Sequence, residues 1–186
     1  LAEMAGQGLC RVGISVTTLD ADLSRRMEPR AAAPKRRLLT ISRLAQAGIP
    51  VRAMVSPMIP GLTDHELEPI LQAARDAGAT AASYISLRLP REVSGLFQDW
   101  LAEHVPDRAA KVMGRVRALH GGMDYDPAFG KRMRGEGPWA DLMARRFRVA
   151  VEPLAEDRAG PTGQDRVAFE IATNPGAPFG DLGAIA

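Results

Sequence analysis

The sequence is poor in cysteine: Cys10 is the only one among 186 residues. A single cysteine excludes a disulfide framework and, within this chain, any metal site built from several cysteines. Long apolar runs are also absent, since none reaches the roughly 18 residues that a membrane-spanning helix needs. Leu1 does not open a signal peptide, so we expect a cytoplasmic protein that makes no use of a membrane. The missing initiator Met leaves open that the chain is a piece of a longer protein.

Net charge is small as well, +2 from 24 basic and 22 acidic residues. This total excludes a highly charged disordered chain and gives no ground for inferring nucleic-acid binding from charge alone. With 46% hydrophobic and 25% charged residues, the composition is that of one globular domain with a core. The charge is unevenly spread, because residues 1–150 hold 22 basic and 16 acidic side chains whereas 151–186 hold 2 and 6.

The segment 151–186 also lacks a sustained hydrophobic period and contains 9 glycines and prolines. It offers too little apolar surface to repay the entropy of ordering. We therefore expect a flexible acidic tail, in which only 166–171 could form a short strand.

The body of the chain alternates predicted strands and helices. Val12, Ile14 and Val16 alternate with small or polar residues, which is typical of a strand with two different faces. The predicted strands start near residues 12, 51 and 81, which is too far apart for hairpins. This spacing fits right-handed crossovers, so the strands should be parallel. The fold class is therefore α/β. The further predicted strands are 51–56 and 81–87, and the predicted helices are 20–27, 34–47, 63–78, 95–105, 106–120 and one from 138.

Helix ends carry their own signals. Thr63 and Glu66 have the spacing of a capping box, so we expect Thr63 to cap the helix that follows it, although Pro69 is awkward inside a helix and the regular part could begin only there. Gly48 and Gly78 stand where a residue in the left-handed conformation would end a helix.

Ligands of parallel α/β folds bind beyond the carboxyl ends of the strands, which selects the segments 15–18, 56–64 and 86–88. On the first strand the aliphatic residues should face the helices. Ser15 and Thr17 would then face the other side, where a small ligand could approach, although both hydroxyls could also serve only to cap the strand end.

The segment 57–64 is stiffened by two prolines, while Gly61 permits a close approach or a positive φ. Such a loop could present Ile59 as an apolar wall for a planar group such as adenine. The alternative is a purely structural turn into the next helix.

Four segments together resemble the later half of radical SAM enzymes: Gly13–Asp20, Glu28–Arg30, Met58–Asp64 and Ser86–Pro90. More closely, they resemble the spore photoproduct lyase-like branch, often labelled DNA repair photolyase-like, with further similarity at 129–130 and 132–138. The resemblance spans residues 9–150. It implies a partial (β/α)6 barrel that holds a 4Fe-4S cluster and S-adenosylmethionine. Reduction of the sulfonium then releases a 5′-deoxyadenosyl radical, which abstracts a hydrogen atom from the substrate.

The resemblance also implies roles for single residues. The end of the first strand would contact the ribose and methionyl part, the Gly61 loop would hold adenine, and the backbone of the third strand would reach adenine as well. Of the Gly-x-Ile-x-Gly-x-x-Glu motif only part carries over, because Pro57 replaces the first glycine and Asp64 the glutamate. One of Arg25, Arg26 and Arg30 could bind the cofactor carboxylate. Alternatively they lie on a solvated helix face, with an Arg30–Glu28 or an Arg–Asp pair. The residues implied in cofactor binding are Ser15, Thr17, Arg30, Ile59, Gly61, Tyr84 and Ser86.

The family's Cys-x-x-x-Cys-x-x-Cys motif has no counterpart here, so the cluster ligands would lie outside this chain. The three histidines, His65, His104 and His120, have no metal-ligand spacing and are expected to be surface or capping residues. We expect a C-terminal fragment that is inactive alone. Its parts would be the second half of the partial barrel (1–100), a helical extension (101–150) and the tail (151–186).

The implied partners are S-adenosylmethionine, a reductant protein such as flavodoxin or ferredoxin, and a nucleic-acid substrate for a lyase or repair reaction. The basic loop 130–135 could contact phosphate, but it lacks nearby stacking aromatic residues other than Tyr125, Phe129 and Trp139, which weighs against nucleic-acid contact. A non-catalytic α/β scaffold or nucleic-acid-binding module remains the alternative. An independent phosphate-binding enzyme has less support because the chain lacks a Gly-rich phosphate loop.

Overall fold

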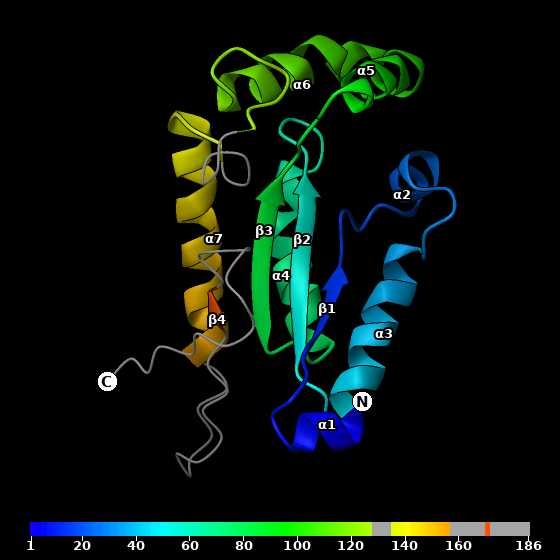
Figure 1. Ribbon diagram of the computed structural model, residues 1–186, viewed down its shortest axis with the longest axis vertical. Helices are drawn as coiled ribbons and strands as arrows, with labels where there is room; N and C mark the ends of the chain where they lie inside the picture. Colours follow the sequence, from blue (N-terminus) through cyan, green and yellow to red (C-terminus); the bar gives the residue numbers. More distant parts are fainter. Residues whose placement is uncertain (128–134, 157–169, 172–186) are drawn as a thin grey trace.

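A parallel sheet forms the centre of the molecule (Figure 1). The computed structural model describes residues 1–127, 135–156 and 170–171. Its strands are joined in the order β1-β2-β3-β4, and every neighbouring pair is parallel. The strands are β1 (Val12–Ser15), β2 (Val51–Met58), β3 (Ala81–Ser86) and β4 (Glu170–Ile171). The predicted α/β class and the predicted parallel direction of the first three strands are thus confirmed.

Helices connect consecutive strands, as the sequence pattern predicts. α2 (Ala21–Met27) and α3 (Pro34–Gln46) lie between β1 and β2, and α4 (Leu67–Asp76) lies between β2 and β3. The short helix α1 (Ala2–Gly6), which no sequence pattern indicated, precedes β1. In Figure 1 the sheet is seen from the face opposite α4.

One face of the sheet packs against helices. Val16, Ala53 and Val55 are fully buried there, together with Ile41 of α3 and Leu71 of α4. The register pairs Ile14 with Ala53, so the aliphatic residues of β1 face the helices as predicted. This hydrophobic burial is the main contribution to the stability of the fold.

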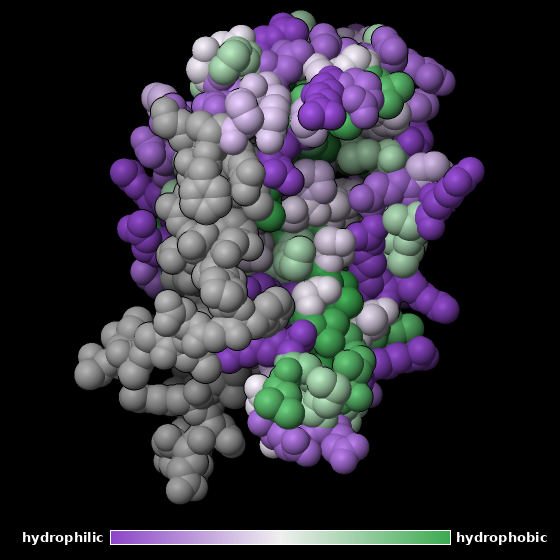
Figure 2. Space-filling view, viewed as in Figure 1, coloured by the Kyte–Doolittle hydropathy of each residue, from purple (hydrophilic) through white to green (hydrophobic). Residues whose placement is uncertain are grey.

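The other face carries smaller and more polar residues. Gly13 and Ser15 are level with Arg52 and Met54 on this side, because paired residues of parallel strands point the same way. Figure 2 looks onto this face, with apolar and weakly polar side chains over the middle of the sheet. The expected sidedness of Ser15 is therefore confirmed.

Two helices lie across the carboxyl ends of the strands in Figure 1, α5 (Glu92–His104) and α6 (Pro106–Leu119). They close a second hydrophobic cluster over the loop after β2. Its buried members are Leu23, Ile59, Leu62, Leu87, Leu89, Leu101, Val112, Met113 and Val116.

The last long helix, α7 (Pro138–Glu156), runs beside α4 and β3. Phe147 of α7 packs on the ring of Tyr84, with centroids 5.0 Å apart. Because α7 continues through Glu156, it crosses the expected boundary at residue 150. β4 falls within the expected strand at 166–171, and the rest of 157–186 lies outside the described residues.

The two predicted helix-ending glycines, Gly48 and Gly78, have φ values of 72° and 103°. The predicted capping box is wrong: Thr63 makes no side-chain bond to the helix, a short 3-10 turn covers Asp64–Glu66, and α4 begins only at Leu67. Within the described ranges, no helix combines the length and the apolar character that crossing a membrane requires.

Candidate functional site

The carboxyl end of β1 is held in place by a residue far along the chain. After Ser15 the chain continues through Thr17 and Thr18, both of which are buried. The Thr18 hydroxyl donates to Oε1 of Glu66 at 2.6 Å, and the amide of Leu19 donates to Oε2 at 2.6 Å. Both carboxylate oxygens of Glu66, which is only 8% exposed, thus accept from this loop.

The same hydroxyl links the loop to the next helix. Thr18 Oγ1 accepts from the amide of Asp20 at 3.0 Å, and the Asp20 carboxylate accepts from the amides of Asp22 and Leu23 at the start of α2. These backbone bonds hold the pKa of Asp20 below its ordinary value, the bond from Leu23 being the largest cause. The segment from the end of β1 to α2 is therefore fixed by two acidic side chains.

Sequence reasoning missed this role of Glu66, because it assigned the residue to a capping box. Thr63, the other half of that box, instead accepts from the amide of Ile59 through its hydroxyl at 2.9 Å. A signal was present: Glu66 directly precedes Leu67 and lies four residues before Ile70, on the apolar stripe of the helix. An acidic residue at such a position has to find hydrogen-bond donors in the interior.

Ser15 is engaged by an arginine of α3. Arg37 Nη1 donates to the Ser15 hydroxyl at 2.7 Å and to the Ser15 carbonyl oxygen at 3.0 Å. Arg37 Nη2 forms an ion pair with Glu28. Glu28 is thus paired with Arg37 and not with Arg30, whereas the alternative of an Arg–Asp pair is realised between Arg25 and Asp22. Arg30 itself is exposed, and it lines a shallow open depression with Glu28, Pro29 and Ala31.

The loop after β2 is packed beneath α6. Ile59 is 1% exposed inside the second cluster, so it does not form the open apolar wall that the sequence suggested. Gly61 has the expected positive φ, +80°, and remains half-buried. A Cβ on Gly61 would lie 3.4 Å from Nη1 of Arg115, and the same nitrogen pairs with Asp64 at 3.3 Å. Within residues 59–63, Gly61 is therefore the one residue that is not buried.

The side chains of Tyr84 and Ser86 point away from the face that carries Ser15. Tyr84 is in register with Val55, a residue of the main core, and Ser86 is in register with Met58 of the same core. Ser86 is also fully buried. Only the backbone of these two residues could meet a ligand that approaches the face of Ser15.

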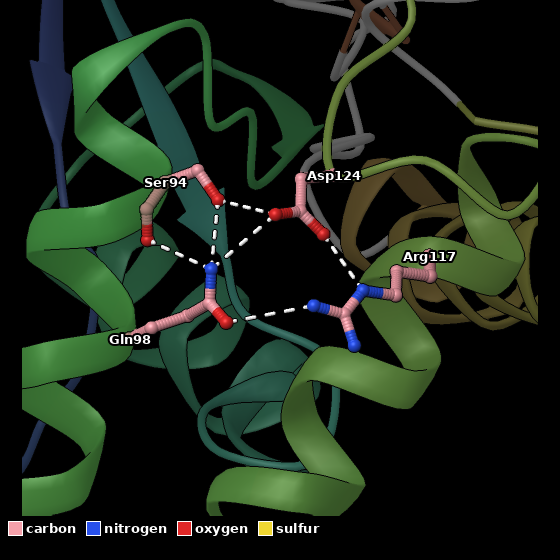
Figure 3. Close-up of polar contacts among 4 residues, drawn as sticks. All are labelled: Ser94, Gln98, Arg117 and Asp124. Carbon is pink, nitrogen blue, oxygen red and sulfur yellow. Dashed lines mark hydrogen bonds and ion pairs between the residues drawn. The ribbon is translucent and has the colours of Figure 1, made fainter.

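A polar network fastens the two helices over the strand ends (Figure 3). Asp124, in the turn after α6, accepts from the hydroxyl of Ser94 and, at 2.7 Å, from Nε of Arg117. Gln98 of α5 donates to the same hydroxyl at 3.1 Å and to Asp124 at 3.3 Å. The bonds from Ser94 and then Arg117 hold the pKa of Asp124 below its ordinary value. Every member has a partner within the network, so its role is to join α5, α6 and the turn.

His120 lies beside this network as the C-cap of α6, which confirms the capping alternative for this residue, and it is buried at 1% exposure rather than at the surface. Its Nε2 lies 3.3 Å from the carbonyl oxygen of Leu87, just past the end of β3. The basic loop 130–135 falls outside the described residues except for Gly135.

The residues of this chain do not fit an iron-sulfur cluster. In residues 1–127 and 135–156 no three His, Cys, Asp or Glu side chains gather to hold a metal ion. Cys10 stands apart, with its thiol 3.4 Å from the carbonyl oxygen of Leu1. Three cysteines of one cluster cannot come from a sequence that has one.

Two of the predicted site residues stay partly accessible at the carboxyl ends of the strands. Ser15 and Gly61 are partly accessible at neighbouring strand ends. Gly13, two residues before Ser15, leaves room for the Met54 side chain, because a Cβ on Gly13 would lie 2.7 Å from the Met54 sulfur. The structure brings Ser15 and the Gly61 loop to the same edge of the sheet, while Arg30 lies farther out, between α2 and α3.

The chain is similar to curated proteins of mycobacteria. It is 32% identical over 152 residues to an uncharacterized protein of Mycobacterium tuberculosis strain H37Rv and to one of Mycobacterium bovis, matches that cover 81% of this chain. The chain spans 43% of the length of these relatives. No solved structure matches it. Residues 1–74, which hold β1, α2, α3, β2 and the first turns of α4, match the Radical SAM superfamily.

Proposed function

We propose that this chain is part of a radical SAM enzyme and supplies one side of its S-adenosylmethionine site. The observation that supports this proposal most directly is the position of the family match in the structure. Residues 1–74 include both strand ends at which Ser15 and Gly61 are accessible, and exclude α5 to α7. The α/β sheet with one face covered by helices is consistent with part of such a barrel.

In this proposal each residue has a limited task. Ser15 offers a hydroxyl, and its bonds from Arg37 fix its rotamer. Thr17 shapes the wall behind Ser15, Ile59 supports the loop from beneath, and Gly61 lets a flat ring approach the backbone. The backbone at Tyr84 and Ser86 supplies further donors and acceptors along the third strand.

Arg30 is the proposed partner of the cofactor carboxylate, since a guanidinium binds a carboxylate through two parallel hydrogen bonds. Its exposure beside the depression at Glu28–Ala31 leaves its donors accessible to a ligand. Arg37, by contrast, is already bound to Glu28 and Ser15.

The 4Fe-4S cluster of the family would have its ligands outside this sequence, and we propose that the chain is inactive without them. When bound, the family's cofactors supply a carbon-centred radical that removes a hydrogen atom from the substrate. Within the family we propose the spore photoproduct lyase-like branch and a lyase or repair reaction on nucleic acid. That proposal is supported by the resemblance at Met58–Asp64 and Ser86–Pro90. A reductant protein such as flavodoxin or ferredoxin would then be a partner.

The test uses the complete reading frame that contains this chain, purified without oxygen and reconstituted with iron and sulfide. We expect a coloured protein that binds iron and sulfide in equal amounts and cleaves S-adenosylmethionine to 5′-deoxyadenosine once reduced. The variant Ser15→Ala should weaken S-adenosylmethionine binding while leaving the iron content unchanged. A colourless protein without iron would overturn the proposal and favour a non-catalytic scaffold.

A further inference from the structure

One side of the molecule carries a concentration of positive charge. No acidic residue occurs between Glu28 and Asp64, whereas Arg30, Lys35, Arg36 and Arg43 in that stretch are all exposed. Figure 2 shows hydrophilic side chains projecting along this side, over α2 and α3. This stretch therefore carries a local excess of positive charge, although the whole chain carries only +2.

The acidic residues that precede this stretch in the sequence already form ion pairs. Glu28 pairs with Arg37, and Asp22 pairs with Arg25 at 3.3 Å. Neither carboxylate extends along α3, whose first turn holds no acidic residue. The positive end of the helix dipole adds to the charge of Lys35 and Arg36 at that turn.

The same surface has an apolar part between the cations. Leu39 is 43% exposed and lies on one stripe of α3 with Arg36 and Arg43, at spacings of three and four residues. Pro29 and the alanines at 31–33, just before the helix, are exposed as well. We call the surface formed by 29–33 and the outer stripe of α3 the basic face.

We propose that the basic face docks a partner protein with an acidic surface. An apolar centre with a charged rim is the usual build of a protein interface. A nucleic acid would use the cations but leaves Leu39 and the alanines without a role, because duplexes are held mainly through phosphate contacts. The stripe from Lys35 to Arg43 carries no aromatic side chain on which bases could stack. The choice of flavodoxin and ferredoxin as acidic partners rests on the proposed function, whereas the charge and exposure of the basic face do not.

Charge complementarity of this kind speeds association and falls with added salt. The affinity should therefore fall steeply as the salt concentration rises. The apolar contact of Leu39 with the partner should contribute to the affinity at low and at high salt. Dependence on both salt and Leu39 distinguishes a protein partner from a polyanion that binds through charge alone.

The experiment measures binding of two small acidic proteins, flavodoxin and ferredoxin, to the 186-residue chain by isothermal titration calorimetry. Arg36→Glu with Arg43→Glu should weaken binding at least about tenfold, since it places like charges across the interface. The matched control is Arg108→Glu with Lys111→Glu on α6, which makes the same change in net charge at exposed positions elsewhere. It should leave the affinity within about twofold, because charge outside the interface acts only through the screened long-range field.

A third variant, Leu39→Ser, keeps every charge and removes the apolar contact, so it should weaken protein binding and leave binding of a short DNA duplex unchanged. Circular dichroism confirms that each variant is folded before titration. The proposal is overturned if neither acidic protein binds, if both charge variants weaken binding equally, or if the duplex binds more tightly than either protein and Leu39→Ser has no effect.

Discussion

Glu66 accepts a hydrogen bond from the hydroxyl of Thr18, although 48 residues separate the two in sequence. Glu66 is the last residue of the 3-10 turn directly before α4, and Thr18 lies in the segment between β1 and α2. This contact joins two neighbouring strand ends through buried side chains, at the edge where the family match and the accessible Ser15 coincide. The geometry of the candidate site therefore depends on a residue that need not touch any ligand.

Replacing Glu66 with Gln should destabilise the protein by about 2 kcal/mol, because a charge-assisted bond is lost and one buried donor faces an amide nitrogen. Chemical denaturation monitored by circular dichroism measures this change. Hydrogen exchange gives a local readout, since the amide of Leu19, which donates to Glu66, should exchange faster in the variant.

The matched control for this prediction is Glu92→Gln, which makes the same chemical change at an exposed position in the first turn of α5. It should shift stability by no more than about 0.5 kcal/mol, as most exposed substitutions do. Equal effects of the two variants on stability and on the Leu19 amide would contradict the structural role of Glu66.

Features that depend on residues close together in the sequence could be predicted, and features that depend on distant residues could not. The alternation of Val12, Ile14 and Val16 is local, so it correctly indicated which side of β1 faces the helices. The burial of Ile59 and His120 depends on α5 and α6 folding back over the strand ends, and no local pattern encodes that packing. The role of Arg37 was missed because its partner Ser15 is 22 residues away in the sequence, whereas that of Glu66 was missed although its place on an apolar stripe gave a signal.

Acidic pH should weaken the contact between α4 and α7. Arg146 of α7 binds Glu68 through two hydrogen bonds, which holds the pKa of that carboxyl below its ordinary value. A carboxyl with a lowered pKa stabilises the fold above its unfolded pKa, about 4.3 for glutamate, and this contribution is lost as pH falls through the lower folded pKa. Comparing wild type with Glu68→Gln by urea unfolding from about pH 3 to pH 7 measures it.

The difference between those two proteins should be largest at neutral pH and vanish at the acid end. It should also be modest, because the pair is partly exposed and water screens it. A difference that stays constant across the whole pH range would show that the substitution acts through packing rather than through the charge of Glu68.

Arg91 stands at a position that favours glycine. Its φ of 53° and ψ of −127° are those of the first central residue of a type II′ turn, and the amide of Val93 closes the turn on the Pro90 carbonyl at 3.1 Å. Arg91→Gly should stabilise the protein by about 0.5–1 kcal/mol, the strain relieved in the fold being partly offset by greater freedom of the unfolded chain. Thermal unfolding measures the gain, and Arg88→Gly, at an exposed position with no positive φ, should give none.

Gly78 is required both by its backbone and by its neighbour. Its φ is 103°, and a Cβ at this position would lie 2.6 Å from the Cβ of Ala45, at the end of the neighbouring helix α3. Gly78→Ala should therefore destabilise the fold by about 1–3 kcal/mol, since α3 or the turn before β3 has to move. Gly95→Ala is the matched control, because Gly95 lies inside α5 with open space around it. That variant should gain up to about 1 kcal/mol from helix propensity. Chemical denaturation of both variants decides the matter, and a stable Gly78→Ala protein would mean that the contact between α3 and the end of α4 is looser than the structure has it.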